Sequence, residues 1–356
     1  MRPYLHSGLT RLWRDPSSVQ FGLSPGRAVV LEGLDDEVRR VLDHLDGTRT
    51  LSRLHRLTGS AGPLLHQLAS RGLLSDADAD ADAGLASLPP LDRERLGPDL
   101  ASLALQRIVP GEAFRTLARR RQQVVQVFGA GRVGAQVAGL LAAAGVGRVE
   151  PRDPGVARPV DLAPGGLRAD SLGQPREAGV ERLVRAVRQG RSARARLRVP
   201  ATGDEPAPSF AVLTPAGLPL PELPVAGALE RAGVPHLLAG VQETTGLVGP
   251  LVLPGITSCL ACRELLRADR DPCWPGLAGQ LAVQQLDGSL LACDVTLSGA
   301  VASAAARQVL AVLDGDVPPA AAGGSLELEA TDWRWRRRSW PVHPACDCRT
   351  AVGRRR

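Results

Sequence analysis

The sequence predicts an α/β protein with a mixed sheet and flanking helices, preceded by a smaller domain of short strands and helices. Three observations carry this prediction. An apolar, β-branched run at 123–128 leads into the glycine-rich turn Gly129-Ala-Gly131-Arg-Val-Gly134 and then a helical pattern. Two close cysteine pairs follow much later in the chain. An Asp-Ala repeat at 76–84 separates this part from a shorter amino-terminal part.

Composition places the chain among globular proteins. Its 356 residues are 44% hydrophobic, which is enough for two domains with buried cores. Arginine supplies the whole basic side of the net charge of +6, since lysine is absent, and asparagine is absent too. The arginines are scattered or lie in short runs, so we expect no nucleic-acid partner. We also expect a cytoplasmic protein without membrane association, because no run reaches the ~18 apolar residues of a membrane span and residues 1–10 lack a signal-peptide core.

The amino-terminal part, 1–75, has strand patterns followed by three helical patterns. Asp35 can cap a helix whose apolar residues recur at three- and four-residue spacing until Gly47 closes it. We predict strands at 19–23 and 28–31, and two further helices at 51–57 and 64–74. Strands followed by three helices are the pattern of a small winged-helix domain.

Residues 76–119 are predicted to be a linker and connecting segment. Within 76–84, aspartates alternate with alanines, so charge repulsion and a lack of apolar side chains favour a solvated linker at a domain boundary. Residues 100–117 are expected to be helical in parts. The second domain is then predicted to span 120–350.

The second domain opens with a strand, a helix and a second strand, at 123–128, 133–144 and 148–150. Such a βαβ unit makes neighbouring strands parallel and gives a Rossmann-like sheet. Further strands are predicted at 209–213, 235–241 and as a pair around 326–340, and helices near 181–188 and at 223–232 and 299–313.

The glycine turn is a candidate nucleotide site. Gly129, Gly131 and Gly134 would let the backbone approach a phosphate at the positive end of the following helix. A ribose would need an acidic residue at the end of the second strand, for which Glu150 and Asp153 are candidates. Pro151 is expected to disturb that strand end. A glycine-permitted crossing from strand to helix without any ligand is the alternative interpretation.

The cysteine pairs Cys259/Cys262 and Cys346/Cys348 are candidate zinc ligands. Thiolates two or three residues apart can reach one tetrahedral zinc, and two such pairs make a closed structural site. That site would tie the carboxy-terminal segment to the domain body. His343 could replace one sulfur in this set.

Other interpretations of the cysteines stay open. The paired cysteines could be unpaired buried thiols, or Cys259 and Cys262 a redox pair. Cys273 and Cys293 each stand alone and are expected to be small apolar core residues. Because a closed four-sulfur site has no position for water, we expect a structural role and no metal catalysis.

Taken together, these features resemble the ThiF/ubiquitin-activating superfamily. Within it, the sequence is most similar to the ThiF-like leader-peptide-binding, cyclodehydratase-domain proteins of thiazole/oxazole-modified microcin pathways, which make ribosomal, bacteriocin-type peptides. The likeness covers most of 120–350 and is carried by the blocks 249–262, 267–275 and 343–348. It implies a ThiF-type mixed sheet with a zinc site at the four paired cysteines.

The first domain is similar to the winged-helix element that recognises leader peptides in these pathways. The likeness is carried by 12–14, 19–23 and 45–50. It implies that an extended leader peptide adds a strand to the edge of the sheet and buries apolar side chains against a helix. A small domain that only packs on its neighbour is the alternative.

The resemblance breaks at the adenylation site. Adenylating members carry an Asn-Leu-x-Arg-Gln segment, a lysine near the triphosphate and a magnesium-binding aspartate; here 153–162 lacks that segment, and Thr214-Pro215-Ala216 offers no carboxylate. Arg132 and Arg158 are candidates to replace the lysine. These groups supply most of the electrostatic stabilisation in nucleotidyl transfer, so we expect the fold to be retained and catalysis to be lost.

The leading hypothesis is therefore a non-catalytic scaffold that binds a precursor leader peptide, a partner cyclodehydratase, or both, in azoline-type peptide modification. Zinc is its expected structural cofactor, and ATP stays open as a ligand. The second hypothesis is an ATP-dependent adenylyltransferase of a peptide or carrier-protein C-terminus. The third is a regulatory or dimerisation module. A homodimer is consistent with the apolar carboxy-terminal helix and with relatives of this fold.

Overall fold

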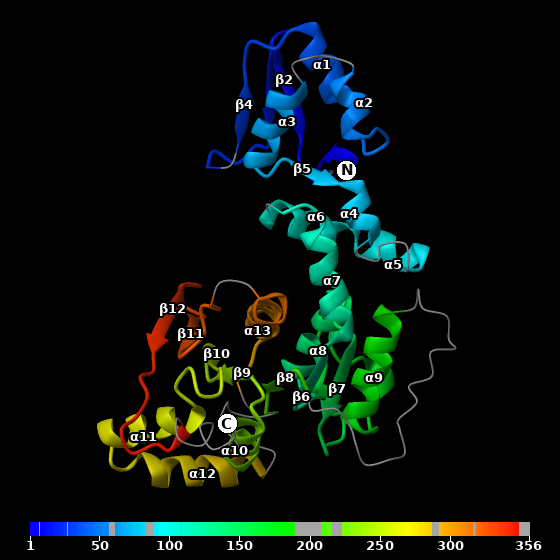
Figure 1. The fold of residues 1–356 in the computed structure, drawn as a ribbon. Coiled ribbons are helices and arrows are strands. Elements are labelled where there is room, and N and C mark those ends of the chain that lie inside the picture. Colours follow the sequence, from blue (N-terminus) through cyan, green and yellow to red (C-terminus); the bar gives the residue numbers. More distant parts are fainter. Residues whose placement is uncertain are drawn as a thin grey trace. The chain divides into compact units, whose positions relative to one another are not determined.

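A computed structural model describes residues 1–6, 8–26, 28–56, 61–82, 88–107, 109–188, 208–215, 223–286, 292–315 and 318–348. These residues form two compact units, one over Met1–Arg119 and the other beginning at Arg120 (Figure 1). The end of the predicted helix 51–57, the end of the Asp-Ala segment and Ala216 lie outside the described residues.

The first unit combines a small antiparallel sheet with three helices. The sheet has the order β2-β3-β4, and β1 pairs separately with β5. Asp35 caps the first helix, as predicted, by accepting a hydrogen bond of 2.8 Å from the Val38 amide. The elements are β1 (Pro3–Leu5), β2 (Arg11–Asp15), β3 (Ser18–Phe21), β4 (Val29–Leu31), α1 (Asp36–Asp43), α2 (Leu51–His55), α3 (Ala61–Ser70) and β5 (Leu74–Asp76).

The Asp-Ala segment differs from the solvated linker that the sequence suggested. Residues Ala77–Asp82 form helix α4, and Asp80 is buried. The Tyr4 hydroxyl donates a hydrogen bond of 2.5 Å to Asp80, while Asp78 pairs with the Arg2 guanidinium and the amino group of Met1. These donors come from the start of the chain and offset the repulsion between the aspartates. Helices α5 (Pro90–Arg95), α6 (Gly97–Gln106) and α7 (Glu112–Gln122) follow.

Replacing Asp80 by asparagine is expected to stabilise the first unit at neutral pH by about 1 kcal/mol, because a buried carboxylate with one unpartnered oxygen becomes neutral. Burial raises the pKa of Asp80 above its ordinary value of 3.8, although the Tyr4 hydrogen bond opposes this. The folded state then binds the proton more tightly. The group's contribution to stability is therefore fully present below about pH 3.8 and is lost as pH rises through the raised value.

Urea unfolding at several pH values measures this effect. The difference between Asp80→Asn and wild type should grow as pH rises from 4 and then level off. Asp36→Asn, a change at a side chain that is 93% exposed, is the matched control. A pH-independent difference would contradict the prediction.

The second unit is built on a seven-stranded mixed sheet with the order β12-β11-β10-β9-β8-β6-β7. Strands β7, β6, β8 and β9 are parallel, and β10, β11 and β12 continue the sheet antiparallel. Their bounds are β6 (Val124–Phe128), β7 (Arg148–Arg152), β8 (Phe210–Leu213), β9 (His236–Gln242), β10 (Thr245–Val252), β11 (Gly324–Glu329) and β12 (Trp335–Ser339).

Helices cover both faces of this sheet. Alternate residues of β8 show the division, since Phe210 and Val212 join one apolar core while Ala211 and Leu213 join the other. The first core is completed by α8 (Gly134–Ala143), α9 (Arg176–Val187) and α13 (Val295–Asp314), and the second by α10 (Leu223–Ala232) and the start of α11 (Leu260–Arg270). Helix α12 (Trp274–Leu286) follows α11.

Helix α13 is the one described helix whose length and composition would allow it to cross a membrane. It packs against α8, β9 and β10, and its residues Val301, Ala302 and Ala305 have no exposed surface. This packing identifies it as the central core helix of the second unit.

Strand β7 continues through Pro151, whereas the sequence suggested that this proline disturbs the strand end. Pro151 pairs in parallel register with Val127 of β6. Among the described strands β7 is the edge of the sheet, where the missing N–H of a proline need not face a neighbouring strand. The strand therefore reaches Arg152, directly before Asp153.

A buried ion pair joins the end of α7 to the end of α13. The Arg120 guanidinium donates two hydrogen bonds of 2.6 Å to the Asp314 carboxylate and a third of 3.2 Å to the Ala144 carbonyl. The exposed fractions of the two side chains are 4% and 0%.

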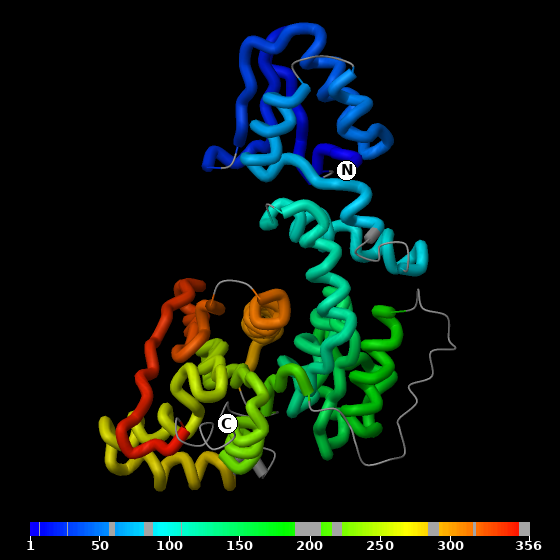
Figure 2. The backbone as a smooth tube through the Cα atoms, viewed as in Figure 1, coloured from blue at the N-terminus to red at the C-terminus, as the bar shows by residue number. Residues whose placement is uncertain are grey.

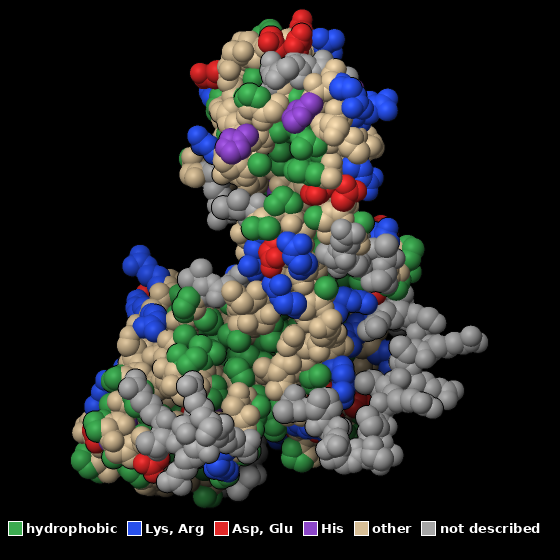
Figure 3. All heavy atoms as spheres, viewed as in Figure 1, with side chains coloured by type: hydrophobic (Ala, Val, Ile, Leu, Met, Phe, Trp, Pro, Cys, Tyr) green, Lys and Arg blue, Asp and Glu red, His purple; other side chains and the backbone are tan. Residues whose placement is uncertain are grey.

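On the face of the molecule drawn in Figure 3, the basic side chains are scattered in small groups over both units.

Candidate functional site

The glycine turn follows β6 and packs tightly against the end of β8. Gly129 has a φ of +97°, and a Cβ atom there would lie 1.7 Å from the Thr214 carbonyl oxygen. A Cβ atom at Gly134 would lie 2.0 Å from the Gly129 carbonyl oxygen. Both positions therefore require glycine. Close backbone packing therefore explains the glycines at these two positions, whether or not a ligand binds at the turn.

Thr214 occupies the end of β8, where the resemblance predicted a missing carboxylate. It is buried, and its hydroxyl faces the carbonyl oxygens of Phe128 at 3.1 Å and Gly129 at 2.9 Å. Its backbone amide also donates to the Phe128 carbonyl. Thr214 thus holds the glycine turn in place from the neighbouring strand.

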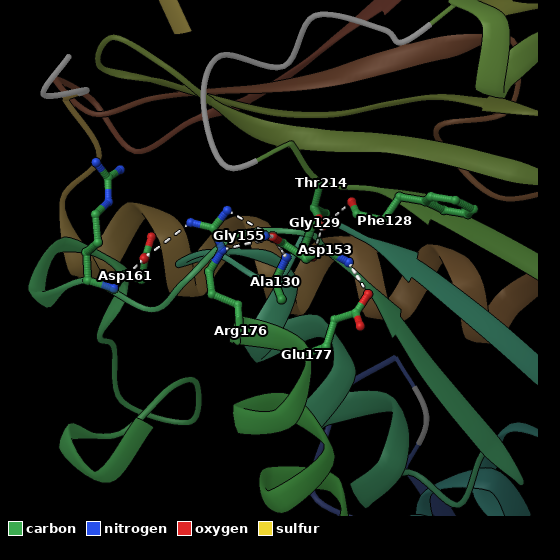
Figure 4. A network of polar contacts seen from close by, with 10 residues as sticks. Phe128, Gly129, Ala130, Asp153, Gly155, Asp161, Arg176, Glu177 and Thr214 are labelled. Carbon is green, nitrogen blue, oxygen red and sulfur yellow. Dashed lines mark hydrogen bonds and ion pairs between the residues drawn. The ribbon is translucent and has the colours of Figure 1, made fainter. Parts of the chain in front are cut away.

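Asp153 directly follows β7, and its carboxylate contacts the backbone of the glycine turn (Figure 4). One carboxylate oxygen accepts a hydrogen bond of 2.6 Å from the Ala130 amide, and the other accepts one of 2.7 Å from the Gly155 amide. The Arg176 guanidinium binds the same carboxylate through Nε at 3.0 Å and Nη2 at 2.9 Å. Of the two acidic candidates in the sequence, Asp153 is the one placed at the glycine turn.

Arg176 and Asp161 were missed by the sequence analysis. Arg176, in the first turn of α9, also pairs with Asp161 at 3.3 Å (Figure 4). Burial alone would lower the pKa of Arg176, but its bonds to Asp153 and Asp161 outweigh burial and raise that pKa. Charged groups therefore do converge at the turn, contrary to the expectation that they are lost. One guanidinium is shared by two carboxylates, so its positive charge is fully engaged and the cluster keeps an excess of negative charge.

Two of the remaining nucleotide candidates, Glu150 and Arg132, are engaged elsewhere, whereas Arg158 is exposed. Glu150 pairs with Arg148 and Arg152, its neighbours on β7, and accepts a hydrogen bond from Gln126. The Arg132 guanidinium is hydrogen-bonded to the carbonyls of Val160 and Cys293, and Arg158 has an exposed side chain.

The four paired cysteines lie together near His236 at the start of β9, away from the strand ends that carry the glycine turn. Their sulfur atoms all lie within 4.8 Å of one another. The distances are 3.7 Å for Cys259–Cys262, 3.5 Å for Cys259–Cys346 and 3.6 Å for Cys262–Cys348. Four sulfurs at ~2.3 Å from a tetrahedral zinc are roughly 3.8 Å apart, so the cluster fits zinc. The distances are far too long for disulfides.

Two segments distant in sequence build this candidate metal centre. Cys259 is the N-cap of α11, where its sulfur accepts a hydrogen bond of 3.4 Å from the Cys262 amide. The chain after β12 runs back to the start of α11 and supplies Cys346 and Cys348 (Figure 2). Burial raises the pKa of Cys259 and that of Cys348, the latter to about 12, whereas for Cys262 hydrogen bonds outweigh burial and lower the pKa. A cation is therefore needed for all four to be thiolates together.

The other candidates stand outside this cluster. His343 is engaged at both ring nitrogens, with Nε2 2.9 Å from Asp269 and Nδ1 accepting from the Ala345 amide. Cys293 packs on the core, as expected. Cys273 is exposed, which contradicts the expectation of a core residue. It follows Asp271 and Pro272 in the turn before α12, where the local turn decides its exposure.

The fold of the chain is the mixed, Rossmann-type α/β fold that the sequence predicted. It is shared by E. coli MccB solved with ATP, at 14% identity and a TM-score of 0.69 over 98% of this chain and 99% of the other. The microcin C7 biosynthetic enzyme MccB in complex with N-formylated MccA gives the same identity and score over 98% and 100%. PaaA is 19% identical, with a TM-score of 0.63 over 94% and 98%.

No family model and no curated protein matches the sequence. The likeness to the solved structures supports the ThiF-like resemblance at the level of the fold.

Proposed function

We propose that this chain is a non-catalytic ThiF-like scaffold of the cytoplasm, with a structural zinc ion at Cys259, Cys262, Cys346 and Cys348. It binds the leader segment of a precursor peptide, and with it a partner cyclodehydratase, in azoline-type peptide modification. Its winged-helix part, 1–75, recognises the peptide, and 120–350 is the ThiF-like body.

The contacts that surround the glycine turn are the observation that supports the absence of catalysis in this proposal. The Asp153 carboxylate accepts a hydrogen bond from the Ala130 amide, and the Arg176 guanidinium is shared by Asp153 and Asp161. Thr214 follows directly after β8 and contacts the turn through its hydroxyl. A triphosphate with magnesium needs free cationic groups and a metal-binding carboxylate. In this network the Arg176 cation is already shared by two carboxylates, and Thr214 stands at the end of β8 in place of a carboxylate, so we expect the chain to lack nucleotidyl transfer.

The first unit offers an edge for an added strand. Strand β4 pairs with β3 on one side and is the last strand of its sheet among the described residues. Val29 and Val30 are half-buried there, which suits an extended peptide that pairs its backbone and packs apolar side chains. MccB, which shares the fold, has been solved with MccA.

Pyrophosphate exchange with ATP tests the absence of catalysis. We expect the purified zinc-loaded chain to give no magnesium-dependent exchange, with and without precursor peptide. Exchange that is abolished by Asp153→Asn would overturn the scaffold proposal and support an ATP-dependent adenylyltransferase. The presence of two carboxylates, Asp153 and Asp161, at the turn is the observation that favours this second candidate, because carboxylates hold the magnesium in nucleotidyl transfer.

Fluorescence anisotropy with a labelled leader peptide from a neighbouring gene tests recognition. We expect saturable binding to the full chain, weakened at least tenfold by Val30→Asp at the β4 edge. Leu91→Asp, at a side chain that is 63% exposed and lies outside 1–75, should bind like wild type. No saturable binding would favour the third candidate, a regulatory or dimerisation module.

A further inference from the structure

Strand β12 is an outermost described strand of the seven-stranded sheet, and it pairs with β11 on one side only (Figure 1). All five of its residues are exposed. The Trp340 amide donates to the Gly323 carbonyl, which lies on the β11 side, and this direction alternates along an antiparallel strand. The backbone groups of Trp335, Arg337 and Ser339 therefore point away from β11. No described strand pairs with them, so they are free to pair with another chain.

An aromatic and a basic side chain share one face of this edge. Trp335 lies opposite Leu328 of β11, and Arg337 lies opposite Leu326. Since alternate residues of a strand point to the same face, Trp335 and Arg337 are neighbours on it. The Trp335 side chain is 40% exposed, and that of Trp333, in the turn before the strand, is 52% exposed. Exposed tryptophan beside arginine is the composition of protein interfaces.

Of the three arginines in β12, only Arg337 has no carboxylate partner among the described residues. Arg336 pairs with Asp332, and Arg338 pairs with Glu327 at 2.8 Å. Arg337 instead donates three hydrogen bonds of 2.6–2.9 Å to neutral acceptors, namely the carbonyls of Ala320 and Ala322 and the Ser339 hydroxyl. A guanidinium has five donors. Arg337 thus keeps donors and an uncompensated positive charge at the open edge.

The charge of this segment disfavours a second copy of the chain as the occupant. Residues 333–340 contain four arginines and no acidic residue. Pairing β12 with β12 of another copy would place arginines opposite arginines, which destabilises a sheet. Basic side chains on an edge strand are a common protection against such self-association. An added strand therefore has to bring negative charge.

We propose that β12 is a docking edge for an extended acidic segment of a partner protein. The segment adds a strand through the outward backbone groups of β12. It places a carboxylate beside Arg337 and, two residues away on the same face, an apolar side chain beside Trp335. This surface belongs to the second unit and does not depend on the peptide recognition that we assign to 1–75.

Fluorescence anisotropy of the full zinc-loaded chain tests this edge. The probe is a labelled peptide with blocked ends, Thr-Leu-Thr-Glu-Thr-Glu-Thr, which alternates threonine with one apolar and two acidic residues. We expect saturable binding, and binding at least tenfold weaker when both glutamates are replaced by lysine. A labelled thymidine trinucleotide of the same net charge should bind more weakly than the acidic peptide. Tighter binding of the trinucleotide would overturn the proposal and assign a nucleic-acid surface.

Two variants at Ser339 test the strand addition. Ser339→Pro removes an outward amide, and proline is tolerated where the N–H of an edge strand faces solvent. Ser339→Ala keeps the amide and, like Ser339→Pro, loses the hydroxyl contact with Arg337. We expect Ser339→Pro to weaken the acidic peptide at least tenfold and Ser339→Ala to bind it within about threefold of wild type. Equal binding by the two folded variants would contradict strand addition.

A second pair of variants tests the charge and stays informative if Ser339→Pro fails to fold. Arg337→Gln should weaken the acidic peptide at least fivefold. Arg40→Gln makes the same change of charge at an exposed residue of α1 and should bind like wild type. Thermal unfolding by circular dichroism verifies that both variants are folded. No saturable binding by wild type, or an equal loss in Arg337→Gln and Arg40→Gln, overturns the proposal.

Discussion

Cys262→Ser is expected to reduce the bound zinc from one ion per chain to a small fraction and to lower the melting temperature of the second unit. Structural zinc contributes ~10–16 kcal/mol to the folding of small zinc-binding peptides. The second unit is also stabilised by its apolar cores, so we expect the loss of zinc to cost less folding free energy here than in those peptides. A loss of about 3 kcal/mol would lower the melting temperature by roughly 6–12 °C.

Cys273→Ser is the matched control, since this thiol is exposed and lies outside the cluster. It should keep both the metal and the melting temperature. Metal content by mass spectrometry of the native protein and thermal unfolding by circular dichroism measure the two effects. Full zinc occupancy in Cys262→Ser would contradict the assignment of this cysteine as a ligand.

Asp314→Ala is expected to destabilise the second unit by about 3–5 kcal/mol, because it leaves the buried Arg120 guanidinium without its counter-charge. The same pair ties the last turn of α7 to the end of α13. Urea unfolding monitored by circular dichroism measures the loss.

The double variant Arg120→Met/Asp314→Leu is the informative control. Replacing both buried charges by apolar side chains of similar size is often close to neutral. The double variant should therefore recover most of the stability lost in Asp314→Ala. A double variant as unstable as Asp314→Ala would show that the contact between the ends of α7 and α13 requires the ion pair itself for its stability.

Local patterns in the sequence were sufficient to predict the strand before the glycine turn, the first helix and the grouping of the four cysteines. The apolar run at 123–128 matches β6, and the cap at Asp35 begins α1 as predicted. The close pairing of cysteines indicated that Cys259 and Cys262 would meet Cys346 and Cys348, because few other groups at such spacing suit one ion.

Contacts between distant side chains could not be predicted in this way. Arg176 meets Asp153 across 23 residues, and Tyr4 meets Asp80 across 76. In both cases the sequence shows only a charged or polar residue, and the partner is determined by the packing of a helix against a strand or strand end that lies elsewhere in the chain. The Asp-Ala segment was misjudged for this reason, since its partners are at the start of the chain.

The two halves of the sulfur cluster leave the ribosome at different times. Cys262 and Cys346 are 84 positions apart, and at ~5–20 residues per second the second pair emerges roughly 4–17 s after the first. During that interval the nascent protein presents a two-thiol half-site. Completion of the cluster is thus a late event in biosynthesis, and a prematurely terminated product would lack the closed centre.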